Sequence, residues 1–329
     1  MKRVETGHKK WRKYMFGLET LDVLIGLVTI YLSFGIACTA FVEAISSWMG
    51  LRSKNLKDGM HEFFQGSITG PDGKAKTFAD EFYNHPLIQT LSKGKDGRPS
   101  YIPTKIVGQV VESMLGFNEQ AEGLKEVLEA LPGENAVENR IKYLLLEFYS
   151  QVKGDVTEFR QAVENHFDAS MERVVGWFKR QTQFVAFMVS AVLVLFANAD
   201  TVEIAHSLAS NPEARGMMVQ VAGKLVEERK AIEANLETQK SKLPETAFEA
   251  AKKKTKAADE AYSRAISDLG STGLKLGWKE LPNTAGGWFS KIAGLLVSIL
   301  AVSLGAPFWF QVLQRFIQVR GAGARSNTK

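Results

Sequence analysis

Residues 23–42 read VLIGLVTIYLSFGIACTAFV and carry no charged side chain across twenty positions. At a helical rise of about 1.5 Å per residue, such a run reaches about 30 Å, the thickness of the hydrocarbon core of a bilayer. The run is too long for the apolar core of a signal peptide, and no small-residue cleavage site follows it. It therefore predicts a transmembrane helix over residues 21–51.

A second apolar run, QTQFVAFMVSAVLVLFANAD, occupies residues 181–200. Trp177, Lys179 and Arg180 precede it, and aromatic and basic side chains of this kind anchor spans at the membrane–water interface. This pattern favours a second span over residues 177–200. Because the purely apolar part covers only 184–197, a buried helix of a soluble domain is the alternative.

The third run, residues 288–314, ends in the sequence SLGAPFWFQVLQ. Pro307 lacks a backbone N–H and Gly305 leaves room for a close neighbour, so a kinked span packed against another helix is expected here. Trp309 suits the headgroup level, and Arg320 is expected in water or on lipid phosphates. These four residues are the candidates for helix packing and anchoring.

The segments between the apolar runs predict two regions outside the bilayer. Residues 52–176 show helical periodicity with no convincing strand and predict a small soluble helical domain. Within 201–287, apolar residues recur at steps of three, four or seven over 218–243 and again over 248–269. This spacing predicts an antiparallel coiled-coil hairpin with its turn near Pro244. The predicted fold is thus all-α: a three-span membrane protein with basic tails at 1–20 and 315–329.

The net charge of +5 is local, because six of the basic residues lie in the first thirteen positions. The sequence contains no stripe of basic and aromatic residues of the kind that would indicate nucleic-acid binding. Basic clusters follow the first span, precede the second and follow the third, and a straight three-span chain would put all three on one side. Asp200 and Glu203 lie beyond the second span, whereas Lys275, Lys279 and Lys291 weaken the argument. The balance favours an outside N-terminus and a cytoplasmic C-terminus, against the charge of the N-terminal tail.

Residues able to carry chemistry are few. The single cysteine, Cys38, lies in the first apolar run, so no intrachain disulfide can form. The five histidines are scattered without metal-ligand spacing, and no phosphate-binding glycine loop or nucleophile elbow is present. Glu43 directly follows the uncharged run, and a carboxylate there is either a candidate ion or proton site or an interfacial group paired with a neighbour. No cofactor, metal site or small-molecule substrate is therefore predicted.

Four stretches resemble an uncharacterised family of bacterial integral membrane proteins. They are DVLIGLVTIYLSFGIACTAFVEAISSWMGLRSKNL, FYNHPLIQTL with RPSYIP, FDASMERVVGWFKRQTQ leading to NADTVEIA, and SLGAPFWFQVLQRFIQVRGAG. They touch both ends and the middle of the chain, and the last is the most specific. The basic tail, residues 2–13, is longer than is usual in the family. The family has no assigned activity, so the resemblance implies a membrane protein and no reaction.

Together these features predict a non-enzymatic, multi-pass protein of the bacterial inner membrane. Small residues on the apolar helices and the extended hairpin suggest a scaffold, or a subunit of a larger assembly, that associates with itself or with other membrane subunits. The alternative is an oligomeric channel or transporter with Glu43 lining the path. An enzyme that uses His85 or His166 in the soluble domain is a third and weaker hypothesis.

Overall fold

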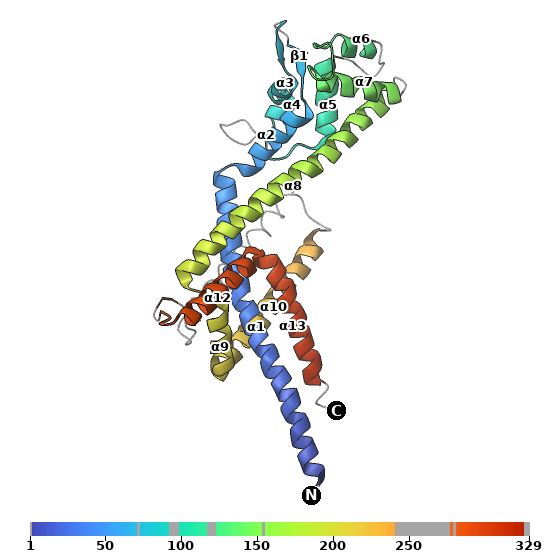
Figure 1. The fold of residues 1–329 in the computed structure, drawn as a ribbon. Coiled ribbons are helices and arrows are strands. Elements are labelled where there is room, and N and C mark those ends of the chain that lie inside the picture. Colours follow the sequence, from blue (N-terminus) through green and yellow to red (C-terminus); the bar gives the residue numbers. More distant parts are fainter. Residues whose placement is uncertain are drawn as a thin grey trace. The chain divides into compact units, whose positions relative to one another are not determined.

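The computed structural model describes residues 2–70, 73–91, 99–116, 123–152, 155–240, 277–278 and 281–325. The chain divides into two compact units: unit 1 (residues 1–44 and 183–329) and unit 2 (residues 45–182). The helices are α1 (Lys2–Trp48), α2 (Leu51–Phe63), α3 (Phe78–Asn84), α4 (Pro86–Gln89), α5 (Thr104–Leu115), α6 (Leu124–Glu129), α7 (Arg140–Gln151), α8 (Val156–Ala197), α9 (Thr201–Ser210), α10 (Pro212–Lys240), α12 (Ala285–Ser303) and α13 (Gly305–Arg325) (Figure 1).

Unit 2 contains one small sheet, which corrects the prediction of a purely helical domain. Strands β1 (Ser67–Thr69) and β2 (Ala75–Thr77) pair antiparallel, with Ile68 opposite Lys76. Each strand has only three residues, too few for the alternation by which a strand is recognised in a sequence. The buried side chain of Ile68 joins the helices, so the sheet belongs to the core of the unit.

The core of unit 2 is built from aromatic and branched side chains of all its helices, Phe64, Phe78, Phe82, Val110, Leu128, Leu145 and Phe159 among them. One buried amide fixes the loops around it. Asn139 precedes α7 and its Oδ1 accepts from the backbone N–H of Lys142, while its Nδ2 donates to Ser67 O at 2.8 Å and to Pro132 O at 2.6 Å. Asn139 thus ties β1 and the end of the α6 segment to the start of α7.

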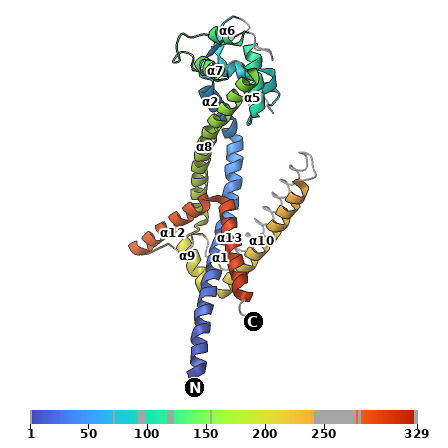
Figure 2. The same cartoon turned by 90° about the vertical axis from the view of Figure 1, so that its right-hand side faces the viewer.

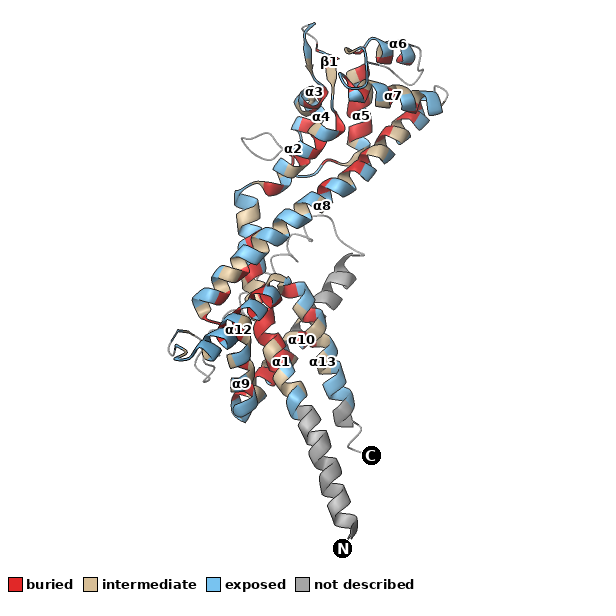
Figure 3. Ribbon diagram, in the orientation of Figure 1, coloured by how far each residue is buried: buried red, intermediate tan, exposed pale blue. Residues whose placement is uncertain are grey.

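Unit 1 is organised around α1, which has a buried face on each side (Figures 1–3). One face packs against α10 and α13, through Ile25, Val28, Leu32, Val219, Ala222, Val226, Ala306, Phe310 and Leu313. The other packs against α8, α9 and α12, through Ile30, Tyr31, Cys38, Val194, Ile204, Leu208, Leu295, Ile299 and Val302. A helix that is apolar over most of its circumference is expected at the centre of a bundle or within a membrane.

Three helices are long and apolar enough to cross a membrane: residues Glu19–Trp48 of α1, α8 and α12. Helix α8 has 42 residues and is therefore about 63 Å long, twice the thickness of a hydrocarbon core. Only its apolar C-terminal part, which begins near residue 181, suits the bilayer interior. Residues 156–180 of the same helix belong to the core and surface of unit 2.

The run expected as one kinked span over 288–314 is in fact two helices. Helix α12 ends at Ser303, and Gly305, with a φ of 78°, turns the chain into α13. Pro307 lies in the first turn of α13, where its missing N–H costs nothing, so the glycine makes the break and the proline follows it. The Trp309 indole Nε1 donates to Ala301 O at 2.6 Å, which satisfies a carbonyl at the open end of α12.

Replacing Gly305 by leucine should destabilise unit 1 by about 1–2 kcal/mol, because an L side chain disfavours the left-handed conformation. Gly321 lies in α13 with open space around its Cα, so Gly321→Leu should be neutral or slightly stabilising. Comparing the free energies of unfolding of the two variants in mild detergent checks this pair. Equal values would mean that the chain does not need the turn at Gly305.

Helix α13 runs antiparallel to α1. At its start, a Cβ added to Gly35 would lie 3.1 Å from the backbone nitrogen of Ala306; at its end, Arg320 Nε donates to Asp22 Oδ1 at 2.7 Å. Asp22 and Arg320 therefore lie at the same end of unit 1. The predicted orientation assumed three straight spans, which would place these two residues at opposite ends. The return of α13 removes that assumption, and which side each terminus faces stays a prediction.

The first arm of the predicted hairpin is helical as α10, up to Lys240. The turn near Pro244 and the second arm, 248–269, lie outside the described residues. The early turns of α10 already have a packing partner, because Met218, Val221 and Leu225 pack in the clusters that contain α1. A coiled-coil seam could therefore begin only beyond these turns.

Candidate functional site

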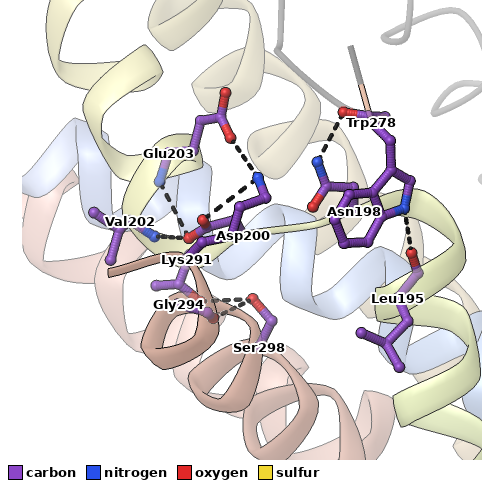
Figure 4. Close-up of polar contacts among 11 residues, drawn as sticks. Leu195, Asn198, Asp200, Val202, Glu203, Trp278, Lys291, Gly294 and Ser298 are labelled. Carbon is purple, nitrogen blue, oxygen red and sulfur yellow. Dashed lines mark hydrogen bonds and ion pairs between the residues drawn. The ribbon is translucent and has the colours of Figure 1, made fainter. Parts of the chain in front are cut away.

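The C-terminal end of α8 is closed by a short segment from a distant part of the chain. Asn198 has a φ of 47°, which asparagine tolerates better than most residues, and its Nδ2 donates to Gly277 O at 2.8 Å. Gly277 N donates to Ala197 O and Trp278 Nε1 to Leu195 O. These bonds satisfy carbonyls that the end of a helix leaves open. They place the Trp278 ring near Lys291 (Figure 4).

Asp200 begins α9 as its N-cap. Its Oδ1 accepts from the backbone N–H groups of Val202, at 2.8 Å, and of Glu203, at 3.4 Å. The residue is only 5% exposed, and it fits because α12 offers a glycine at the point of contact. A Cβ added to Gly294 would collide with the Asp200 carboxylate.

Lys291 lies within α12, one of the three apolar helices, and is also only 5% exposed. Its Nζ lies 3.2 Å from Glu203 Oε2 and 3.8 Å from Asp200 Oδ2, and 5.6 Å from the centre of the Trp278 ring. A charge in this environment is tolerated only when it is paired and hydrogen-bonded. We call Asp200, Glu203, Lys291 and Trp278 the ion cluster (Figure 4).

A chain of hydroxyl groups lies beside the ion cluster and joins α1, α9 and α12. Ser298 Oγ donates to Gly294 O at 3.1 Å. A serine hydroxyl has one hydrogen to donate, so Ser298 accepts from Thr201 Oγ1, 2.7 Å away, and Thr201 in turn accepts from the Tyr31 hydroxyl at 2.7 Å. Each of the three hydroxyl groups thus donates to one defined acceptor. These hydrogen bonds hold the three helices together within apolar surroundings.

The ion cluster opens on one side to a pocket of about 710 Å³ between α9 and the start of α12. Besides Asp200, Glu203 and Lys291, hydroxyl and imidazole groups line it, including Ser207, Ser290 and His206. The wall therefore mixes polar groups with apolar ones such as Leu281 and Pro282, and two carboxylates face one ammonium group in it. Among the residues that the structure describes, no group of three His, Cys, Asp or Glu side chains could hold a metal ion.

The sequence-predicted candidates lie apart from this cluster. Glu43 is exposed on α1, and within the described part of the chain it makes no hydrogen bond or ion pair. Gly305 and Pro307 form the α12–α13 turn. The Trp309 ring lies tilted against that of Tyr31, with ring centres 4.8 Å apart, and Arg320 pairs with Asp22. The last two make contacts within the chain beyond the interfacial roles predicted for them.

The two histidines of the enzyme hypothesis have local partners in unit 2. His85 caps α4: its Nδ1 accepts from Leu87 N, and its Nε2 lies 3.1 Å from Ser113 Oγ. Since Nδ1 accepts, Nε2 carries the proton of the neutral ring, and burial lowers the pKa of His85, which favours this form. The His166 ring lies against Phe63 and Phe148.

Sequence reasoning missed the ion cluster, although one signal was available. Lys291 falls inside a helix that is otherwise apolar, and an ionisable residue within such a helix marks a functional candidate together with its partner. From the sequence alone, Lys291 counts only as one of three basic residues beyond the second span that weaken the charge argument for the orientation. The partners of Lys291, Asp200 and Glu203, lie some ninety positions earlier in the chain, so only the fold shows that the three residues meet.

Comparisons with protein-family models, with curated proteins and with solved structures find no match to this chain. The resemblance to an uncharacterised membrane-protein family therefore stays a prediction.

Proposed function

We propose that this protein is a non-enzymatic, multi-pass subunit of a bacterial inner-membrane assembly, and that it associates with copies of itself. The observation that carries the proposal is the difference between two apolar helices. Half of the apolar window of α1 is buried within the chain, against only 11% of that of α8. Helix α8 thus has apolar surface left for lipid or for a neighbouring chain (Figure 3).

The small residues that first suggested self-association are occupied within the chain. A Cβ at Gly26 would meet Leu208, one at Gly35 would meet the α12–α13 turn, and one at Gly294 would meet Asp200. The self-association surface is therefore assigned to α8. Phe184, Met188, Val192 and Leu195 are exposed and follow one another at steps of four, four and three, so they form one stripe along the helix.

Cross-linking tests this assignment. With Cys38 replaced by alanine, a cysteine at Met188 should give covalent dimers with a short bifunctional maleimide in native membranes, because two stripes would face each other. Phe187→Cys is the matched control, since Phe187 is also exposed but lies off the stripe. Monomers from both variants, together with a monomeric mass in mild detergent, would refute self-association through α8.

A further inference from the structure

Unit 2 contains a second pocket, of about 300 Å³, between α2, α7 and α8. Its lining combines two basic groups, Arg140 and Arg173, and one carboxylate, Glu62, with apolar walls that include Phe63 and Trp177. His166 also lines it. This mixture differs from the ion cluster of unit 1, where carboxylates predominate. We call it the basic pocket.

The positive charge of the basic pocket is only weakly neutralised by the protein. Arg140 Nη1 lies 3.6 Å from Glu62 Oε1 and 3.3 Å from Gln65 Oε1, and the ion pair is exposed at both ends. Exposed pairs of this kind contribute little and exchange readily. Arg173 has only a long contact, 3.4 Å, to Ser170 Oγ, and no carboxylate of the described chain lies within 4.0 Å of it. Both guanidinium groups can therefore take a new anionic partner.

The positive charges of Arg140 and Arg173 both reach the ring of His166. Burial lowers the pKa of His166, and the positive charges of Arg173 and Arg140 lower it further. The imidazole is about 22 Å along α8 from the start of the apolar part, and so lies outside the expected bilayer. An anion bound between the arginines would offset their field at the ring.

We propose that the basic pocket binds a phosphate group carried on an apolar body. Guanidinium groups hold phosphate oxygens through paired N–H donors, which makes arginine the preferred residue for this ligand. The side chains of Phe63, Leu144, Val174 and Trp177 provide the apolar walls for the rest of the ligand. This inference does not depend on self-association of the protein.

Two sources could supply such a phosphate group. Trp177 lies four positions before the predicted start of the apolar part of α8, so one end of the pocket is near the level of lipid headgroups. An anionic phospholipid such as phosphatidic acid would bind from the bilayer. A free aryl or alkyl phosphate would bind from the solution, and the two sources share the same recognition by Arg140 and Arg173.

Titration of the full chain in mild detergent separates these sources. The probes are phenyl phosphate and dioctanoyl phosphatidic acid. The control is dioctanoyl phosphatidylcholine, a zwitterion with no net charge whose phosphate is esterified on both sides, and binding is measured by isothermal calorimetry. One of the two phosphate probes should bind, and Arg140→Gln and Arg173→Gln should each weaken it about tenfold or more, as expected for charge-assisted hydrogen bonds. Binding should also raise the pKa of His166, followed by NMR, because an anion favours the charged imidazole.

Arg52→Gln is the matched control, because Arg52 is a basic residue of unit 2 that lines a different pocket. It should change the affinity less than twofold. Binding of phenyl phosphate alone identifies a soluble ligand, and binding of phosphatidic acid alone identifies a lipid. If neither probe binds, or if Arg52→Gln weakens binding as much as Arg173→Gln, the pocket is no phosphate site and the inference is wrong.

Discussion

Replacing Lys291 by methionine should destabilise the protein by about 3–5 kcal/mol. Methionine keeps much of the volume of the side chain but removes the ammonium group, which leaves the buried Asp200 carboxylate without a cation. The cost of breaking a buried ion pair comes mainly from the charge that is left unpaired. We expect the loss in the free energy of unfolding, measured by denaturing-detergent titration of the protein in mild detergent micelles.

A second substitution separates charge from packing. In Lys291→Met with Asp200→Asn, the asparagine still caps α9 and the more deeply buried carboxylate is gone. The Glu203 carboxylate also loses its cation but is partly exposed, so part of the lost stability should return. Lys125→Met is the matched control, since Lys125 forms an exposed pair with Glu129 four residues along α6 and should cost less than about 1 kcal/mol. A single Lys291→Met variant that is no less stable than this control would mean that the ion cluster is not buried as described.

Replacing Asn139 by leucine should cost about 3 kcal/mol or more and should act on unit 2. The residue is 1% exposed, and leucine has nearly the same shape but no donor or acceptor. The carbonyls of Ser67 and Pro132 and the N–H of Lys142 would all lose their partner. Each buried polar group left without a partner costs about 1–3 kcal/mol, although such costs are not additive.

The control for this variant is Asn165→Leu. The Asn165 side chain accepts one exposed hydrogen bond, from Gln161 one turn away, so its loss should cost less than about 1 kcal/mol. Thermal unfolding gives the size of each effect, and hydrogen exchange of β1 gives its location. Unchanged protection of β1 in Asn139→Leu would contradict the role assigned to this amide.

Much of the helical content follows from local sequence patterns. The charge-free length of residues 23–42 predicts a helix that could cross a membrane, and the regular spacing of apolar residues from 218 onward predicts the helix found as α10. Both depend on neighbours within a few turns, where helical periodicity acts. The structure agrees with each of these predictions because tertiary packing does not oppose them.

The parts that failed depend on contacts between distant residues. The kink was expected from Pro307, but the chain turns at Gly305, which supplies the positive φ that the turn needs. The return of α13 along α1 could not be predicted, because Gly35 and Asp22 meet it from almost three hundred positions away. The ion cluster is similar: the sequence offers Lys291 in an apolar helix as a signal, but its partner Asp200 is identified only by their burial on facing helices.

The return of α13 also has a consequence for how the protein is made. Arg320 follows its partner Asp22 by 298 positions, so the ribosome needs roughly 15–60 s to deliver one after the other. During that time the face of α1 that includes Ile25, Val28 and Leu32 lacks its final cover. The α10 residues of the same cluster are made earlier and cover part of this face, and we expect lipid or an insertion factor to cover the rest until α13 is complete. Chains that stop before Gly305 should be recognised as incomplete and degraded.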